Sequence, residues 1–145
     1  MKICAVDTCI LMRLAAGDPA DLFMKTVESL EALLDRHVGL RIVAHNIVIG
    51  EAYIALQHHY GFTKAESRKT LTHVLTSGLI EPLDGKAALE TLDTASKGAG
   101  LVDRLILLDS HARSTAPLLT LDAALAKVPG ATGLHLLGAA AGTQS

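Results

Sequence analysis

Short runs of mostly apolar residues alternate along the chain with longer segments in which apolar residues recur every three or four positions. Short apolar runs are typical of strands buried on both faces, and the longer spacing is typical of amphipathic helices. Pro82 lies inside one such run and predicts an edge strand or an irregularity there, because proline has no backbone N–H. The predicted strands span residues 3–6, 41–45, 79–83, 117–120 and 134–137.

Helices are predicted between the strands, and several have recognisable start signals. Asp7 or Thr8 can cap the first helix, and Asn46 can cap the third. Thr63 and Glu66 have the spacing of a capping box, which predicts the start of the fourth. The predicted helices span residues 7–16, 19–37, 47–60, 63–76, 86–96, 101–112 and 123–127.

Strands that alternate with helices predict an α/β fold, because each crossover between parallel strands needs a helix. We expect a three-layer α/β/α arrangement with a central, mostly parallel sheet. The 145 residues suffice for one domain with a real core. We expect this domain to span residues 1–137, followed by a flexible Ala- and Gly-rich tail over residues 138–145.

The composition narrows the class of protein. The formal net charge of -2 gives no overall basic field, so contact with nucleic acid would need a local patch of Lys and Arg. Cys4 and Cys9 have no metal-site spacing and fit reduced thiols in the cytoplasm. No stretch of about 18 apolar residues is present, so we expect a cytoplasmic protein without membrane contact.

Four acidic residues lie in apolar sequence contexts: Asp7, Glu51, Asp103 and Asp122. Asp7 and Asp122 are predicted at carboxyl ends of strands, where open α/β sheets form ligand sites. An ionised carboxylate in apolar surroundings carries a desolvation penalty, which a cation usually compensates. Each acid also has a simpler interpretation. Asp7 and Asp122 can be helix caps, Asp103 a first-turn charge, and Glu51 a salt-bridged edge residue.

The four acids together favour a metal site. Converging carboxylates would repel by about 4 kcal/mol per close pair at an effective dielectric constant of about 20, so such a cluster needs a cation. Oxygen ligands without clustered Cys or His favour Mg²⁺ or Mn²⁺ over zinc. Ions of this kind suit the cleavage of phosphodiester bonds.

Four motifs in this order, VDTCIL, IVIGEAYIAL, GLVDRLIL and LLTLDAALAKVPG, resemble those of the PIN-domain nucleases, in particular the VapC-type toxins of toxin–antitoxin pairs. The resemblance runs from Lys2 to about Leu137. It implies a Mg²⁺- or Mn²⁺-dependent endoribonuclease whose acidic site consists of Asp7, Glu51, Asp103 and Asp122. It also implies an RNA substrate, an antitoxin partner and a homodimer.

Further residues are candidates for supporting roles. Thr120 matches the hydroxyl-bearing residue that the PIN-domain family has two positions before its last acid. Thr8 matches the small polar residue that follows the first acid of the family. Arg104 follows Asp103 where many relatives have a small residue, so it is either an RNA contact or a surface charge. Arg13, the other cation near the acids in sequence, and Thr8 are also candidates for binding the RNA substrate. We interpret Asp109 as structural, because helix geometry points it away from Asp103.

Two other classes of function remain open. A strand-end Asp7 is also the position of an aspartyl-phosphate nucleophile or phosphoacceptor, although a phosphatase would place a second acid where Cys9 stands. The third class is a catalytically silent PIN-like module that binds a partner protein through an apolar groove.

Overall fold

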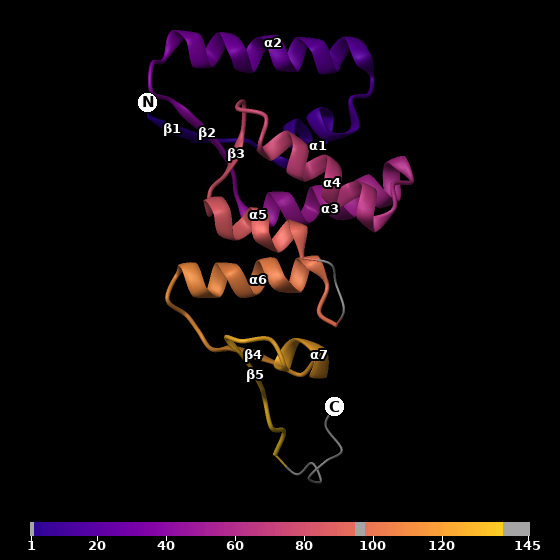
Figure 1. The fold of residues 1–145 in the computed structure, drawn as a ribbon, viewed down its shortest axis with the longest axis vertical. Coiled ribbons are helices and arrows are strands. Elements are labelled where there is room, and N and C mark those ends of the chain that lie inside the picture. The colour runs from indigo at the N-terminus through magenta and orange to yellow at the C-terminus, as the bar shows by residue number, and fades with distance from the viewer. Residues whose placement is uncertain (1, 95–97, 138–145) are drawn as a thin grey trace. The chain divides into compact units, whose positions relative to one another are not determined.

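The computed structural model describes residues 2–94 and 98–137 (Figure 1). The predicted order of strands and helices is confirmed, and most boundaries agree within one or two residues. The elements in chain order are β1 (Ile3–Ala5), α1 (Thr8–Ala16), α2 (Ala20–Arg36), β2 (Arg41–Ala44), α3 (Asn46–Tyr60), α4 (Lys64–Leu75), β3 (Glu81–Pro82), α5 (Gly85–Asp93), α6 (Leu101–Ala112), β4 (Leu118–Thr120), α7 (Ala123–Ala126) and β5 (Ala131–Gly133).

The chain divides into two compact units, residues 1–94 and residues 95–145. The expected single domain over residues 1–137 stays a prediction. The tail predicted over residues 138–145 and the end of the helix predicted over residues 86–96 lie outside the described residues.

The first unit contains a parallel three-stranded sheet in the order β1-β2-β3. Ala5 pairs with Val43, and Val43 pairs with Glu81. The carboxyl ends of the three strands therefore lie next to one another at the same end of the sheet. Parallel strands joined through helices are what the alternating pattern predicts, so the α/β class is confirmed. The three junctions between a strand and the helix that follows it therefore lie at this same end of the sheet.

The core of the first unit is aliphatic. Leu11 of α1, Ile49 and Leu56 of α3 and Leu71 of α4 are completely buried. Burial of each such side chain contributes about 1.5–3 kcal/mol. In Figure 1, α2 runs on one side of the three strands, and α3 and α5 run on the other.

The second unit contains α6 and a parallel pair of short strands, β4 and β5, which are joined through α7. Leu118 pairs with Ala131, and Thr120 pairs with Gly133. Leu105 of α6 and Leu125 of α7 are buried. A parallel crossover through a helix is again what the sequence predicts.

The last strand differs from its prediction. It was expected at residues 134–137 but forms at Ala131–Gly133 instead. The apolar side chains after it are exposed, Leu137 completely so. The reason is register, because β4 ends at Thr120, opposite Gly133, and Leu134 makes only one further backbone hydrogen bond, to the Thr120 carbonyl.

Of two further predictions in the first unit, the edge strand at Pro82 is confirmed and the helix cap at Asn46 is wrong. The strand expected over residues 79–83 is reduced to Glu81–Pro82, and it lies at an edge of its sheet, as Pro82 predicts. Asn46 does not cap α3; it is the first residue of that helix, and His45 occupies the cap position.

No helix in residues 2–94 and 98–137 combines the length and apolar character that a membrane crossing requires.

Candidate functional site

Asp7 lies at the junction between β1 and α1. Val6 is buried and continues the strand pairing through its N–H, which donates to the Val43 carbonyl at 3.0 Å. The chain then turns into α1, and Asp7 Oδ1 accepts a hydrogen bond from the Ile10 N–H at 3.2 Å. The predicted cap is confirmed. It uses one carboxylate oxygen, and the Asp7 side chain is exposed at the edge of the sheet.

Glu51 comes to the same junction from α3. The Thr8 hydroxyl donates a hydrogen bond to Glu51 Oε2 at 3.1 Å, across 43 positions in the chain. The neighbours of Glu51 in sequence, Gly50 and Ala52, are both buried, whereas Glu51 itself is exposed. Two of the four predicted acids are therefore connected through one threonine: Asp7 precedes it in the chain, and Glu51 accepts its hydroxyl hydrogen bond.

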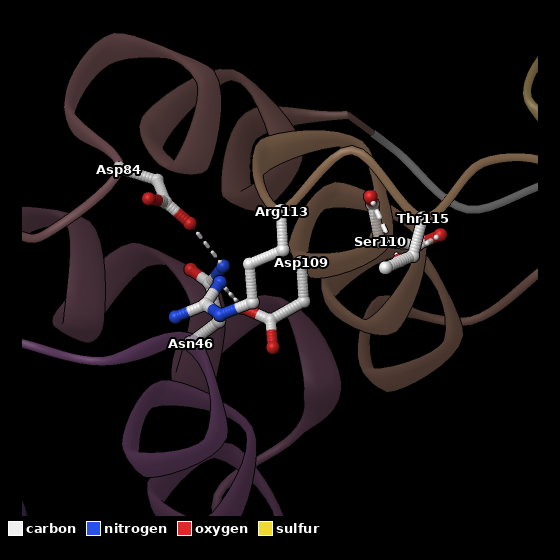
Figure 2. A network of polar contacts seen from close by, with 6 residues as sticks. All are labelled: Asn46, Asp84, Asp109, Ser110, Arg113 and Thr115. Carbon is white, nitrogen blue, oxygen red and sulfur yellow. Dashed lines mark hydrogen bonds and ion pairs between the residues drawn. The ribbon is translucent and has the colours of Figure 1, made fainter.

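The edge of the sheet also carries a polar pair that the sequence did not assign to the site. The buried side chain of Asn46 donates a hydrogen bond from Nδ2 to Asp84 Oδ2. Figure 2 shows the amide of Asn46 and the carboxylate of Asp84 directed toward each other. Asn46 lies two positions after the last residue of β2, and Asp84 lies two positions after the last residue of β3. Asp84 follows a strand as Asp7 does, but Asp-Gly is also ordinary turn chemistry, so the sequence pattern alone does not assign Asp84 to the site.

Asp122 lies at the junction between β4 and α7 in the second unit. Its Oδ1 accepts hydrogen bonds from the N–H groups of Ala124 at 2.8 Å and Leu125 at 3.1 Å. Its own N–H donates to the Thr120 hydroxyl at 3.0 Å. Thr120 thus holds the backbone of Asp122, and Asp122 caps the helix, in the same strand-to-helix arrangement as Asp7.

Asp103 lies in the first turn of α6 and is half-buried. The next residue, Arg104, donates from Nε to the Ala99 carbonyl at 3.1 Å, so part of its guanidinium is used within its own unit. Arg13 lies in the last turn of α1 and is half-buried.

Asp109 of α6 forms an ion pair at 2.9 Å with Arg113, the residue that directly follows the helix, in agreement with a structural role (Figure 2). The same figure shows Thr115, whose hydroxyl donates to the Ser110 hydroxyl at 3.0 Å after the helix ends. The ion pair and this hydrogen bond stabilise the carboxyl end of α6 and the residues that follow it.

The four predicted acids divide equally between the units. Asp7 and Glu51 belong to the first, and Asp103 and Asp122 to the second. Three of the four are exposed and Asp103 is half-buried, so desolvation does not supply an argument for a cation. Over residues 2–94 and 98–137, no group of three or more His, Cys, Asp or Glu side chains is arranged to hold a metal ion. The four-acid cluster therefore stays a prediction.

No family model matches the chain, and no curated protein or solved structure matches it either.

Proposed function

We propose that this chain is a divalent-metal-dependent endoribonuclease of the PIN type, the toxin of a toxin–antitoxin pair, with Asp7, Glu51, Asp103 and Asp122 as its acidic site. The observation that carries the proposal is the Thr8–Glu51 hydrogen bond, which joins an acid-bearing helix to the helix start that Asp7 caps. Both acids belong to the edge where open parallel sheets form their ligand sites.

The carboxylates are equipped to bind a further group. Asp7 and Asp122 each commit Oδ1 to helix capping, and Glu51 commits Oε2 to Thr8. Within the described residues, the second oxygen of each makes no hydrogen bond. A carboxylate that is held by one oxygen and offers the other is oriented before a ligand arrives, which lowers the entropic cost of binding.

The donor set suits magnesium or manganese. All four side chains offer hard oxygen atoms, and Cys4 and Cys9 lie outside the set, which disfavours zinc. A divalent ion bound there would activate water and neutralise charge on a phosphate. Thr8 and Thr120 would orient Glu51 and Asp122.

The finer features of the proposal follow from the same family resemblance. It includes a PIN-like three-layer arrangement, a homodimer, an antitoxin partner and a location in the cytoplasm. Apolar side chains on the helices support a protein partner, since Leu22 and Met24 of α2 and Ile47 and Ile54 of α3 are exposed. Co-expression with the product of the neighbouring reading frame tests this part, and a chain that stays monomeric and unbound contradicts it.

Cleavage of single-stranded RNA tests the activity. We expect the purified protein to cut RNA with Mg²⁺ or Mn²⁺ but not with EDTA. Asp103→Asn and Glu51→Gln should abolish cutting, because each removes a negative oxygen while keeping the size of the side chain. Asp35→Asn is the matched control, since Asp35 is an exposed acid of α2 outside the site. Equal cutting by Asp103→Asn and the unmodified protein would contradict the proposal.

A further inference from the structure

The second unit contains a hollow to which neither the four acids nor the family resemblance gives a function. Its volume is about 360 Å³, within the range of about 300–1,000 Å³ that is typical of small-molecule sites. It is lined by Gly98 and Ala99 before α6, by Arg104 on that helix, and by Lys127, Val128 and Pro129 after α7. All of these residues belong to one unit and are described in the structure.

The lining of the hollow is positive on one part and apolar on another. Arg104 and Lys127 supply two cations, and none of the described residues that line the hollow is acidic. Arg104 uses Nε to hold the Ala99 carbonyl, and within the described residues its terminal guanidinium nitrogens and Lys127 Nζ have no hydrogen-bond or ion-pair partner. Two cations on one small hollow without a counter-charge attract an anion.

The loop beside the hollow is defined by the backbone conformation of Gly98 and by a hydrogen bond from Arg104. Gly98 has a φ of 89°, a conformation that side chains disfavour. A Cβ added to Gly98 would lie 3.9 Å from the Cβ of Ala124, in ordinary contact with α7. The Arg104–Ala99 hydrogen bond fixes the other end of the same loop. Arg104 therefore has a positioning role for the loop in addition to its charge.

We propose that this hollow binds a backbone phosphate of single-stranded RNA. Arg104 and Lys127 would contact the phosphate oxygens, and Val128 and Pro129 would contact the attached sugar or base. Guanidinium and ammonium groups are the usual partners of phosphate. The choice of RNA rests on the proposed nuclease function, and Arg104 adjoins the predicted ligand Asp103 in sequence.

Binding measured in EDTA tests this inference without turnover. A fluorescent single-stranded RNA oligonucleotide is titrated with the protein at several salt concentrations. We expect Lys127→Ala to weaken binding several-fold and to lower the slope of log K against log salt by about 0.7, the value for one lost phosphate contact on a single strand. Lys25→Ala is the control, because Lys25 is an exposed cation of α2 and its removal changes the net charge equally.

The outcomes separate this inference from the nuclease proposal. Titration with inorganic phosphate, followed through the amide signals of Gly98 and Ala99, should shift those signals in the unmodified protein but not in Lys127→Ala. RNA that binds through Lys127 but is never cut leaves the phosphate site intact and contradicts the nuclease. RNA binding that is equal in Lys127→Ala and the unmodified protein overturns the inference. Phosphate shifts without RNA binding overturn RNA as the ligand.

Discussion

Thr8 and Glu51 form a hydrogen bond of 3.1 Å between residues that stand 43 positions apart, and this contact connects the first helix of the chain to the third. Thr8 directly follows Asp7, the residue that caps α1. One hydroxyl therefore both orients Glu51 and ties it to the end of β1. The two helices also pack against each other, and Leu11 of α1 and Ile49 of α3 are completely buried.

Substitution of Thr8 tests the contribution of this hydrogen bond. Thr8→Val keeps the shape of the side chain but removes the donor, and we expect it to lower the free energy of unfolding by about 0.5–1 kcal/mol, since the bond is exposed. Denaturation in urea measures the change. Thr8→Ser retains the hydroxyl and serves as the control. A loss of stability in Thr8→Ser as large as that in Thr8→Val would mean that the hydroxyl is not the group that matters.

Asp7 allows its capping role to be separated from its charge. Asn and Asp are about equally good N-caps, whereas replacement of such a cap by Ala costs about 1 kcal/mol. We therefore expect Asp7→Asn to keep the stability of the protein and to lose RNA cleavage, and Asp7→Ala to lose both. Urea denaturation and a cleavage assay on the same preparations distinguish the two effects. Full cleavage by Asp7→Asn would leave Asp7 with the capping role alone.

The sequence predicted most of what local chemistry determines. The capping box of Thr63 and Glu66, the helix start at Asp7 and the edge position of Pro82 each depend on a few neighbouring residues, and each is confirmed. The cap predicted at Asn46 is a local exception, and the other wrong prediction concerns a contact between distant segments. Leu134 to Leu137 look like a buried strand, but the pairing partner ends at Thr120, and no local signal contains that fact.

The site shows the same division between local and distant chemistry. The helix caps at Asp7 and Asp122 could be predicted, because each acid directly precedes a helix. The bond from Asn46 to Asp84 could not, because both residues are also ordinary cap or turn residues and only the register between β2 and β3 brings them together. The Thr8 bond to Glu51 likewise depends on how α1 packs against α3.

Removal of the capping box should destabilise the fold without touching the candidate site. Thr63 Oγ1 accepts from the Glu66 N–H at 3.0 Å, and Glu66 Oε1 accepts from the Thr63 N–H at 3.2 Å. We expect Thr63→Ala to lower the free energy of unfolding by about 1 kcal/mol, because an uncapped helix start loses a partner for its N–H groups. Thr63→Ser, which keeps the oxygen, should be close to the unmodified protein. Urea denaturation provides the measurement, and unchanged stability of Thr63→Ala would contradict the structural assignment.

The pair formed by Asn46 and Asp84 should matter more than an exposed hydrogen bond. Asn46 is buried, and its donor is directed at a charged acceptor. Hydrogen bonds to charged groups contribute about 1.5–3 kcal/mol, so Asn46→Ala should lower the stability by an amount in that range. Asp84→Asn keeps an acceptor oxygen and should cost less than Asp84→Ala. Equal stability of Asn46→Ala and the unmodified protein, measured by denaturation in guanidinium chloride, would argue against this bond.

Thermal unfolding in the presence of manganese tests whether the four acids share an ion. A ligand at 100 times its Kd stabilises the folded state by about 2.7 kcal/mol, which for a chain of this size raises Tm by on the order of 10 °C. Because the proposal uses acids from both units, Glu51→Gln in the first unit and Asp103→Asn in the second should each reduce the shift, while Asp35→Asn should not. A shift that responds to Glu51→Gln but is unchanged by Asp103→Asn would place the ion in the first unit alone. That result would contradict the four-acid site and leave Asp7 and Glu51 as a two-carboxylate site.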